Sequence, residues 1–130
     1  MIEYKTNFPI SAEQFTELLN KTSLGARRPL EDKKRVAAML HHADLLVTAW
    51  DGELLVGVAR SVTDFSYCCY LSDLAVDEQY QKQGIGLQLI EYTKQALHPQ
   101  AKIVLLSAPQ AVDYYPHIGF TQHMSAWTKS

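Results

Sequence analysis

The stretch that decides the fold is Leu71-Ser-Asp-Leu-Ala-Val76, followed four residues later by Gln81-Lys-Gln-Gly84-Ile-Gly86. An apolar strand leads into a loop with two closely spaced glycines, and a helical pattern begins there. The first turn of a helix has main-chain N–H groups without internal partners, and the helix dipole adds positive charge. Glycines let a phosphate approach this main chain closely. The sequence therefore predicts a strand–loop–helix unit that can cradle a pyrophosphate.

Two common phosphate-binding motifs do not match this loop. A P-loop needs Lys-Ser or Lys-Thr directly after its glycines, and neither pair directly follows Gly84 or Gly86. A dinucleotide-binding fingerprint needs a third glycine three residues after Gly86, where the chain has Leu89. The pattern that remains is Val76-x4-Gln81-x2-Gly84-x-Gly86.

The length and composition indicate one globular domain over residues 1–130, with 47% hydrophobic and 20% charged residues. Twelve basic residues face fourteen acidic ones, which argues against nucleic acid or an anionic membrane as the main partner. No apolar run approaches the roughly 20 residues of a membrane span. The N-terminus lacks the pattern of a signal peptide. We therefore expect a cytoplasmic protein with no nucleic-acid or membrane partner.

The cysteines and histidines give no sign of a metal site. Cys68 and Cys69 are adjacent in an expected strand, so their side chains point to opposite faces and do not easily form a disulfide. This fits a reducing compartment. The five histidines lack the spacing of zinc ligands, so we expect no metal.

The first half of the chain predicts strands and helices in the order β-α-α-β-β-β. Ser11 and Gln14 have the spacing of a capping box at the start of the first helix. The dipeptide Asp51-Gly52 is a strong hairpin signal. The expected strands are Ile2–Thr6, Leu45–Trp50, Glu53–Val62 and Tyr67–Val76, and the second helix carries Val36 and Leu40.

The second half predicts the order α-β-α-β. Apolar residues recur at helical spacing from Ile85, and Pro99 ends that helix. Lys102–Leu106 is expected to be a buried strand, and Pro109 to open a fourth helix that ends at Gly119. A last strand is expected over Phe120–Trp127. The whole order, β-α-α-β-β-β-α-β-α-β, indicates a mixed α/β fold with antiparallel hairpins before a crossover unit.

Two motifs resemble signatures of one family. The Gln81–Gly86 segment resembles the acyl-CoA signature (Gln/Arg-x-x-Gly-x-Gly/Ala) of the GNAT superfamily of acyl-CoA-dependent N-acetyltransferases. The segment Tyr114-Tyr115-Pro-His-Ile-Gly119-Phe120 resembles the family's Phe-Tyr-x-x-x-Gly-Phe. The order of elements is also similar, so the resemblance covers nearly the whole chain. It implies a single N-acetyltransferase domain that uses acetyl-CoA as cosubstrate.

The resemblance also implies where acetyl-CoA binds. The pantetheine arm would lie between the Tyr67–Val76 and Lys102–Leu106 strands and pair with the main chain at Leu74 and Val76. The pyrophosphate would contact the N–H groups of the glycine loop. The expected binding residues are Leu74, Ala75, Val76, Gln81, Lys82, Gln83, Gly84, Ile85, Gly86, Leu87 and Tyr115.

Tyr115 and Leu74 are the main catalytic candidates. A main-chain N–H near Leu74 could stabilise the negative charge on the thioester oxygen. A phenol, with an ordinary pKa of about 10, could protonate the departing thiolate, and Tyr115 occupies the matching position. The alternative for Tyr115 is a core aromatic, the role expected of Tyr114. Pro116 within the helix and Ala108, where many relatives have a CoA-contacting asparagine, depart from the family pattern.

Three charged residues have two interpretations each. Asp73 should point away from Leu74 and could attract or deprotonate the acceptor amine, or could be a buried structural carboxylate near the second helix. Arg27 and Arg28 could hold a substrate carboxylate, or could be solvated surface charges.

The predicted function is direct transfer of an acetyl group from acetyl-CoA to a primary amine of an unspecified small molecule or peptide. The alternative is a non-catalytic acyl-CoA-binding or regulatory module. We also expect a homodimer, because a strand at Phe120–Trp127 would leave an open sheet edge.

Overall fold

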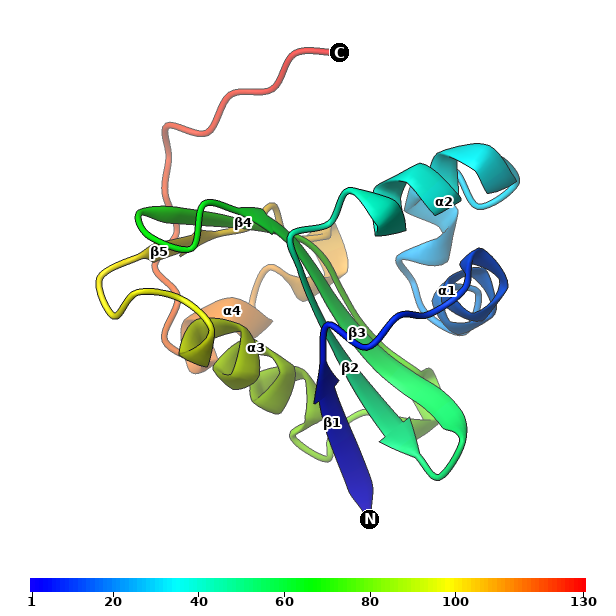
Figure 1. Cartoon of the computed structure of the whole chain (residues 1–130). Helices are drawn as coiled ribbons and strands as arrows, with labels where there is room; N and C mark the ends of the chain where they lie inside the picture. The colour runs from blue at the N-terminus through cyan, green and yellow to red at the C-terminus, as the bar shows by residue number, and fades with distance from the viewer.

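The computed structural model describes residues 1–130 apart from the side chain of Gln110. Its centre is a five-stranded sheet in the order β1-β2-β3-β4-β5, antiparallel except for the last pair. Helices α1 and α2 lie on one face, and α3 and α4 lie on the other (Figure 1). The strands are β1 (Ile2–Thr6), β2 (Leu45–Asp51), β3 (Leu54–Thr63), β4 (Cys68–Val76) and β5 (Lys102–Val104). The helices are α1 (Ala12–Leu19), α2 (Lys33–His41), α3 (Ile85–Gln95) and α4 (Tyr114–His117), with 3-10 turns at Gly25–Arg27, Glu78–Tyr80 and Pro109–Ala111.

The mixed α/β class is confirmed, and so is the capping box predicted at Ser11 and Gln14. The Ser11 side chain accepts a hydrogen bond from the Gln14 amide, and the Gln14 side chain accepts one from the Ser11 amide. This capping box starts α1, whose residues Phe15, Leu18 and Leu19 are buried against the sheet. Within the described part of the chain, no helix has both the length and the apolar character needed to cross a membrane.

The β2–β3 hairpin turns one residue later than the Asp51-Gly52 signal predicts. Asp51 is the last residue of β2 and pairs with Leu54, so Gly52 and Glu53 form the turn. Gly52 has φ +60°, which a two-residue hairpin requires at its first turn position and which glycine adopts without strain.

A bulge in β4 decides which side chains face which helices. Arg60 of β3 pairs with Asp73, but Ser61 pairs with Leu71, so Ser72 is an extra residue in β4. Leu71 packs in the cluster under α3, and Leu74 joins that cluster after the bulge. Asp73 consequently points to the other face, towards the loop between α1 and α2.

Strand β5 pairs with only part of β4. The parallel pairing joins residues 68–70 to residues 102–104, and beyond it β4 has no partner on that edge among the described residues. The expected buried strand Lys102–Leu106 is therefore shorter and more exposed than predicted. Val104 and Leu106 are 46% and 49% exposed because no further strand covers them.

The fourth helix is also shorter than predicted. The expected Pro109–Gly119 helix is divided into the Pro109–Ala111 turn and the four-residue α4. Pro116 lies inside α4 and cannot donate a helical hydrogen bond, which limits its length. Gly119, with φ +96°, follows α4, consistent with the predicted end.

The predicted last strand, Phe120–Trp127, is wrong. This segment is irregular and runs away from the sheet, and Met124 and Trp127 are 87% and 91% exposed (Figure 1). A strand needs a neighbour to satisfy its main chain, and no strand among the described residues pairs with this segment. The homodimer stays a prediction, but its original basis in an edge at residues 120–127 is absent.

Replacing Gly25 with alanine should destabilise the loop that follows α1. The added Cβ would lie 2.5 Å from the carbonyl oxygen of Leu19, so the main chain must shift. We expect a loss of about 1–3 kcal/mol in the free energy of unfolding, measured by urea denaturation. Ala26→Ser, at an exposed neighbouring position, should change it by less than about 0.5 kcal/mol. Equal midpoints for Gly25→Ala and the wild type would contradict this packing.

Candidate functional site

One cleft of about 560 Å³ brings most of the predicted site residues together. It runs between the unpaired edge of β4, the start of α3, the segment around α4 and the loop after α1. The predicted residues that line it are Leu74, Ala75, Val76, Gln81, Lys82, Gly84, Ile85, Gly86, Leu87 and Tyr115. Gln83 belongs to the same loop but does not line the cleft, and Asp73 lies behind the cleft wall.

The glycine loop presents main-chain donors to this cleft. Gly84 caps α3 with φ +80°, and Lys82 also has a left-handed φ of +64°. The Gln81 side chain donates to the Val76 carbonyl at 3.1 Å and ties the loop to the end of β4. Among the described groups, the N–H groups of residues 81–87 have no hydrogen-bond partner. They can therefore bind an anion with help from the helix dipole.

Gly86 lies where a side chain would enter the cradle. A Cβ at this position would be 3.2 Å from the Tyr114 hydroxyl oxygen and 3.9 Å from the Val76 side chain. Glycine therefore keeps open the space between the start of α3 and Tyr114.

Tyr114 and Tyr115 both line the cleft, with ring centroids 5.3 Å apart. Tyr115 also packs edge-on against Phe120 at 5.5 Å, which holds its ring beside the short α4. Burial raises the pKa of Tyr115, and Tyr114 raises it further, so the hydroxyl remains protonated above neutral pH. Tyr114 is 41% exposed and reaches towards Gly86, so the expectation that it is a core aromatic is wrong.

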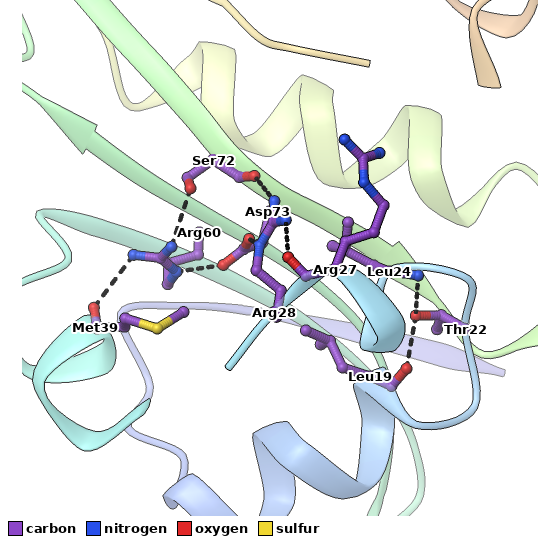
Figure 2. A network of polar contacts seen from close by, with 9 residues as sticks. All are labelled: Leu19, Thr22, Leu24, Arg27, Arg28, Met39, Arg60, Ser72 and Asp73. Atoms are coloured by element: carbon purple, nitrogen blue, oxygen red, sulfur yellow. Dashed lines mark hydrogen bonds and ion pairs between the residues drawn. The ribbon is translucent and has the colours of Figure 1, made fainter. Parts of the chain in front are cut away.

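Asp73 is fully buried and shared by two arginines (Figure 2). Its Oδ1 accepts from Arg28 Nε at 2.5 Å, and its Oδ2 accepts from Arg60 Nε. The side chain points away from Leu74, as predicted, and does not reach the cleft. This geometry favours the structural interpretation of Asp73, because both carboxylate oxygens accept hydrogen bonds from arginines. The catalytic role of Asp73 stays an untested prediction.

Arg28 is neither a fully solvated charge nor a free one. Its terminal nitrogens donate to the carbonyls of Arg27 at 2.9 Å and Ser72 at 2.8 Å, and the residue lines the cleft. Arg27 is exposed and does not line the cleft. The role of Arg60 was not predicted. A signal was present in the sequence, because Arg60 is the one charged residue within an apolar strand. The structure pairs it with Asp73 of β4.

The comparisons with known proteins decide the family. A family model described as an acetyltransferase (GNAT) domain matches residues 12–129. The chain belongs to the GNAT acetyltransferase family. A chloroplastic GCN5-related N-acetyltransferase 2 from Arabidopsis thaliana is 37% identical over 68 residues, which are 51% of this chain and 26% of that protein. An uncharacterized N-acetyltransferase from Gracilaria tenuistipitata is 31% identical over 97 residues, 72% of this chain and 53% of that protein. The chain thus spans about a quarter to a half of these relatives.

Solved structures show the same GNAT fold. A GNAT-family acetyltransferase from Streptococcus pneumoniae superposes with a TM-score of 0.79 at 24% identity, covering 99% of this chain and 98% of that one. A GNAT N-acetyltransferase from Escherichia coli, in complex with CoA, gives 0.70 at 23% identity, covering 92% and 68%.

Binding of acetyl-CoA to the cradle should raise the melting temperature, and Gly86→Val should abolish this shift. A ligand that binds only the folded state stabilises by about 2.7 kcal/mol at 100 times its Kd. The valine side chain would occupy the space between the loop and Tyr114, while the fold should remain largely intact. Scanning fluorimetry with and without acetyl-CoA measures the shift.

The control is Ala96→Val, which adds similar bulk at an exposed position just beyond the far end of α3. It should retain the full shift. An unchanged shift in Gly86→Val would mean that acetyl-CoA binds elsewhere.

Proposed function

We propose that this GNAT domain transfers the acetyl group of acetyl-CoA directly to a primary amine. The observation that carries the proposal is the continuity of one cleft, which joins the unpartnered N–H groups of the glycine loop, the open edge of β4 and the Tyr115 side chain. The Escherichia coli protein of the same fold binds CoA, which supports the choice of cosubstrate. No metal is needed for this chemistry.

Different residues of the cleft would bind different parts of acetyl-CoA. The N–H groups of residues 81–87 would hold the pyrophosphate, because they combine free donors with the positive end of α3. The main chain at Leu74 and Val76 would pair with the amide-rich pantetheine arm, since β4 has no partner along this edge. The thioester would then lie between β4 and Tyr115.

The acyl transfer needs two groups from the protein. A main-chain N–H near Leu74 would stabilise the negative charge that develops on the thioester oxygen when the amine attacks, an effect worth a few kcal/mol. Tyr115 would then donate its phenolic proton to the departing CoA thiolate as the carbon–sulfur bond breaks. Burial raises the pKa of Tyr115, so the hydroxyl carries a proton when the thiolate forms, although the same shift makes the phenol a weaker acid.

The acceptor amine must lose its proton without help from Asp73, whose two oxygens are occupied by arginines. Water in the open cleft can accept this proton. An amine that binds in its neutral form needs no general base before it attacks.

Release of free thiol from acetyl-CoA, measured across a panel of primary amines, tests the function. Turnover that depends on an amine, with the acetylated amine identified by mass spectrometry, supports the transferase. Tight binding of acetyl-CoA without turnover on any amine would instead favour the acyl-CoA-binding module. Ala108 and the short α4 are the features that favour this second function.

Tyr115→Phe should lower kcat by about 100- to 10,000-fold, the usual contribution of a positioned acid. Burial raises the pKa of Tyr115 above its ordinary value, so the wild-type rate should fall only as pH rises through that raised pKa. The variant lacks the ionising hydroxyl and should lose this alkaline limb. Affinity for acetyl-CoA should hardly change, because the ring and its packing on Phe120 remain.

Tyr67→Phe is the matched control, since Tyr67 is 79% exposed and does not line the cleft. It should keep the wild-type kcat and pH profile. Nearly full kcat in Tyr115→Phe would assign protonation of the thiolate to water or to another residue.

A further inference from the structure

Arg28, Asp73 and Arg60 form a cluster in which one buried carboxylate binds two guanidinium groups (Figure 2). Arg28 comes from the loop between α1 and α2, Asp73 from β4 and Arg60 from β3. Each oxygen of Asp73 accepts from a different guanidinium. Hydrogen bonding on both sides fixes the carboxylate and, through it, both arginine side chains.

This cluster carries one excess positive charge. Guanidinium groups stay protonated at every accessible pH, so two arginines and one carboxylate sum to a single positive charge. Among the described residues, no second carboxylate forms an ion pair with Arg28 or Arg60. A buried charge without a counterion is costly. An anion supplied from outside the chain would therefore be bound favourably.

The excess charge is accessible only through Arg28. The side chain of Arg60 is 9% exposed and donates to Asp73, Ser72 Oγ and the Met39 carbonyl, away from solvent. The Arg28 side chain is 20% exposed and lines the cleft. Three of its five N–H groups bind described partners, which leaves two N–H groups for a ligand.

Arg28 also lies close to the position proposed for the reacting acetyl group. It donates to the carbonyl of Ser72, two residues before Leu74 in β4. Two residues of a strand span roughly 7 Å. Thr22 and Leu24 also line the cleft, so the loop that follows α1 contributes several residues to its wall. An acceptor whose amine reaches the thioester beside Leu74 would thus have its other end within reach of Arg28.

We propose that Arg28 is a specificity-determining residue that binds a carboxylate on the acceptor, so that the substrates are amino carboxylates rather than polyamines or other polycations. This inference rests on the proposed acetyl transfer. A carboxylate can accept both remaining N–H groups of Arg28 and neutralise the excess charge of the cluster. The same positive charge disfavours an ammonium group and favours the neutral amine, which is the form that attacks the thioester.

The test uses a series of amino carboxylates that differ in the distance between the amine and the carboxylate. Each is compared with the carboxamide of the same length. Rates of thiol release are compared at equal concentrations of unprotonated amine. For the best-fitting length, kcat/KM for the carboxylate should exceed that for the carboxamide by about 10- to 100-fold, the range expected for a charge-assisted hydrogen bond. Spermidine should be a poorer acceptor than either.

Arg28→Gln should raise the KM for the carboxylate acceptor, so that the ratio of kcat/KM between carboxylate and carboxamide falls to about 1. Asp73 keeps Arg60 as a partner in this variant, so the buried pair remains neutral. Arg27→Gln is the matched control, because it removes the same charge from an exposed neighbour outside the cleft. It should keep the wild-type preference. The comparison in the wild type tests the proposal even if Arg28→Gln does not fold.

The outcomes separate this inference from the proposed function. Turnover that favours carboxamides or spermidine, or a carboxylate preference that survives in Arg28→Gln, would overturn the role of Arg28 and leave the transferase in place. Absence of turnover on every amine would contradict the transferase. In that case the N-acetylated carboxylates should still raise the melting temperature of the CoA-bound protein more than their carboxamides. Equal shifts would overturn the inference as well.

Discussion

Strand β4 is paired with β3 throughout most of its length but with β5 over only three residues. The candidate site depends on the part of β4 that β5 leaves unpaired. The open edge provides main-chain groups for an extended ligand, and the loop that follows β4 delivers the start of α3 to the same side. The bulge at Ser72 turns Asp73 to the opposite face. One strand thereby borders the candidate cleft on one side and a buried charge cluster on the other.

The cleft is positively polarised at two places although the chain as a whole has a net charge of −2. At the start of α3 the charge is partial and comes from N–H groups and the helix dipole. At Arg28 it is a full charge. Asp73 orients this guanidinium group but does not neutralise it, because the same carboxylate also pairs with Arg60. Local geometry therefore determines which ligands are favoured, and the overall composition carries little information about them.

How much the sequence revealed depends on the range of the interactions involved. The capping box of α1 and the glycine loop involve neighbours in the chain, and both were predictable. The Phe120–Trp127 segment has the pattern of a strand, but a strand requires a partner, and pattern alone does not provide one. Arg28 was an open candidate because its partners in β4, Asp73 and Ser72, are more than forty residues away in the sequence. Arg60 and Asp73 are each a charge within an apolar strand, which was a signal for the cluster. Their pairing depends on the bulge at Ser72, which the sequence pattern does not reveal.

The two walls of the cleft come from separate stretches of the chain. The loop between α1 and α2 provides Arg28, whereas the segments after β4 provide the glycine loop and Tyr115. Because β4 lies between them, the first wall can change by mutation while the second retains its geometry. Under the proposed function, the acceptor could change without altering the part of the cleft proposed to bind CoA. Such independence would let a family diversify its substrates while its fold stays recognisable.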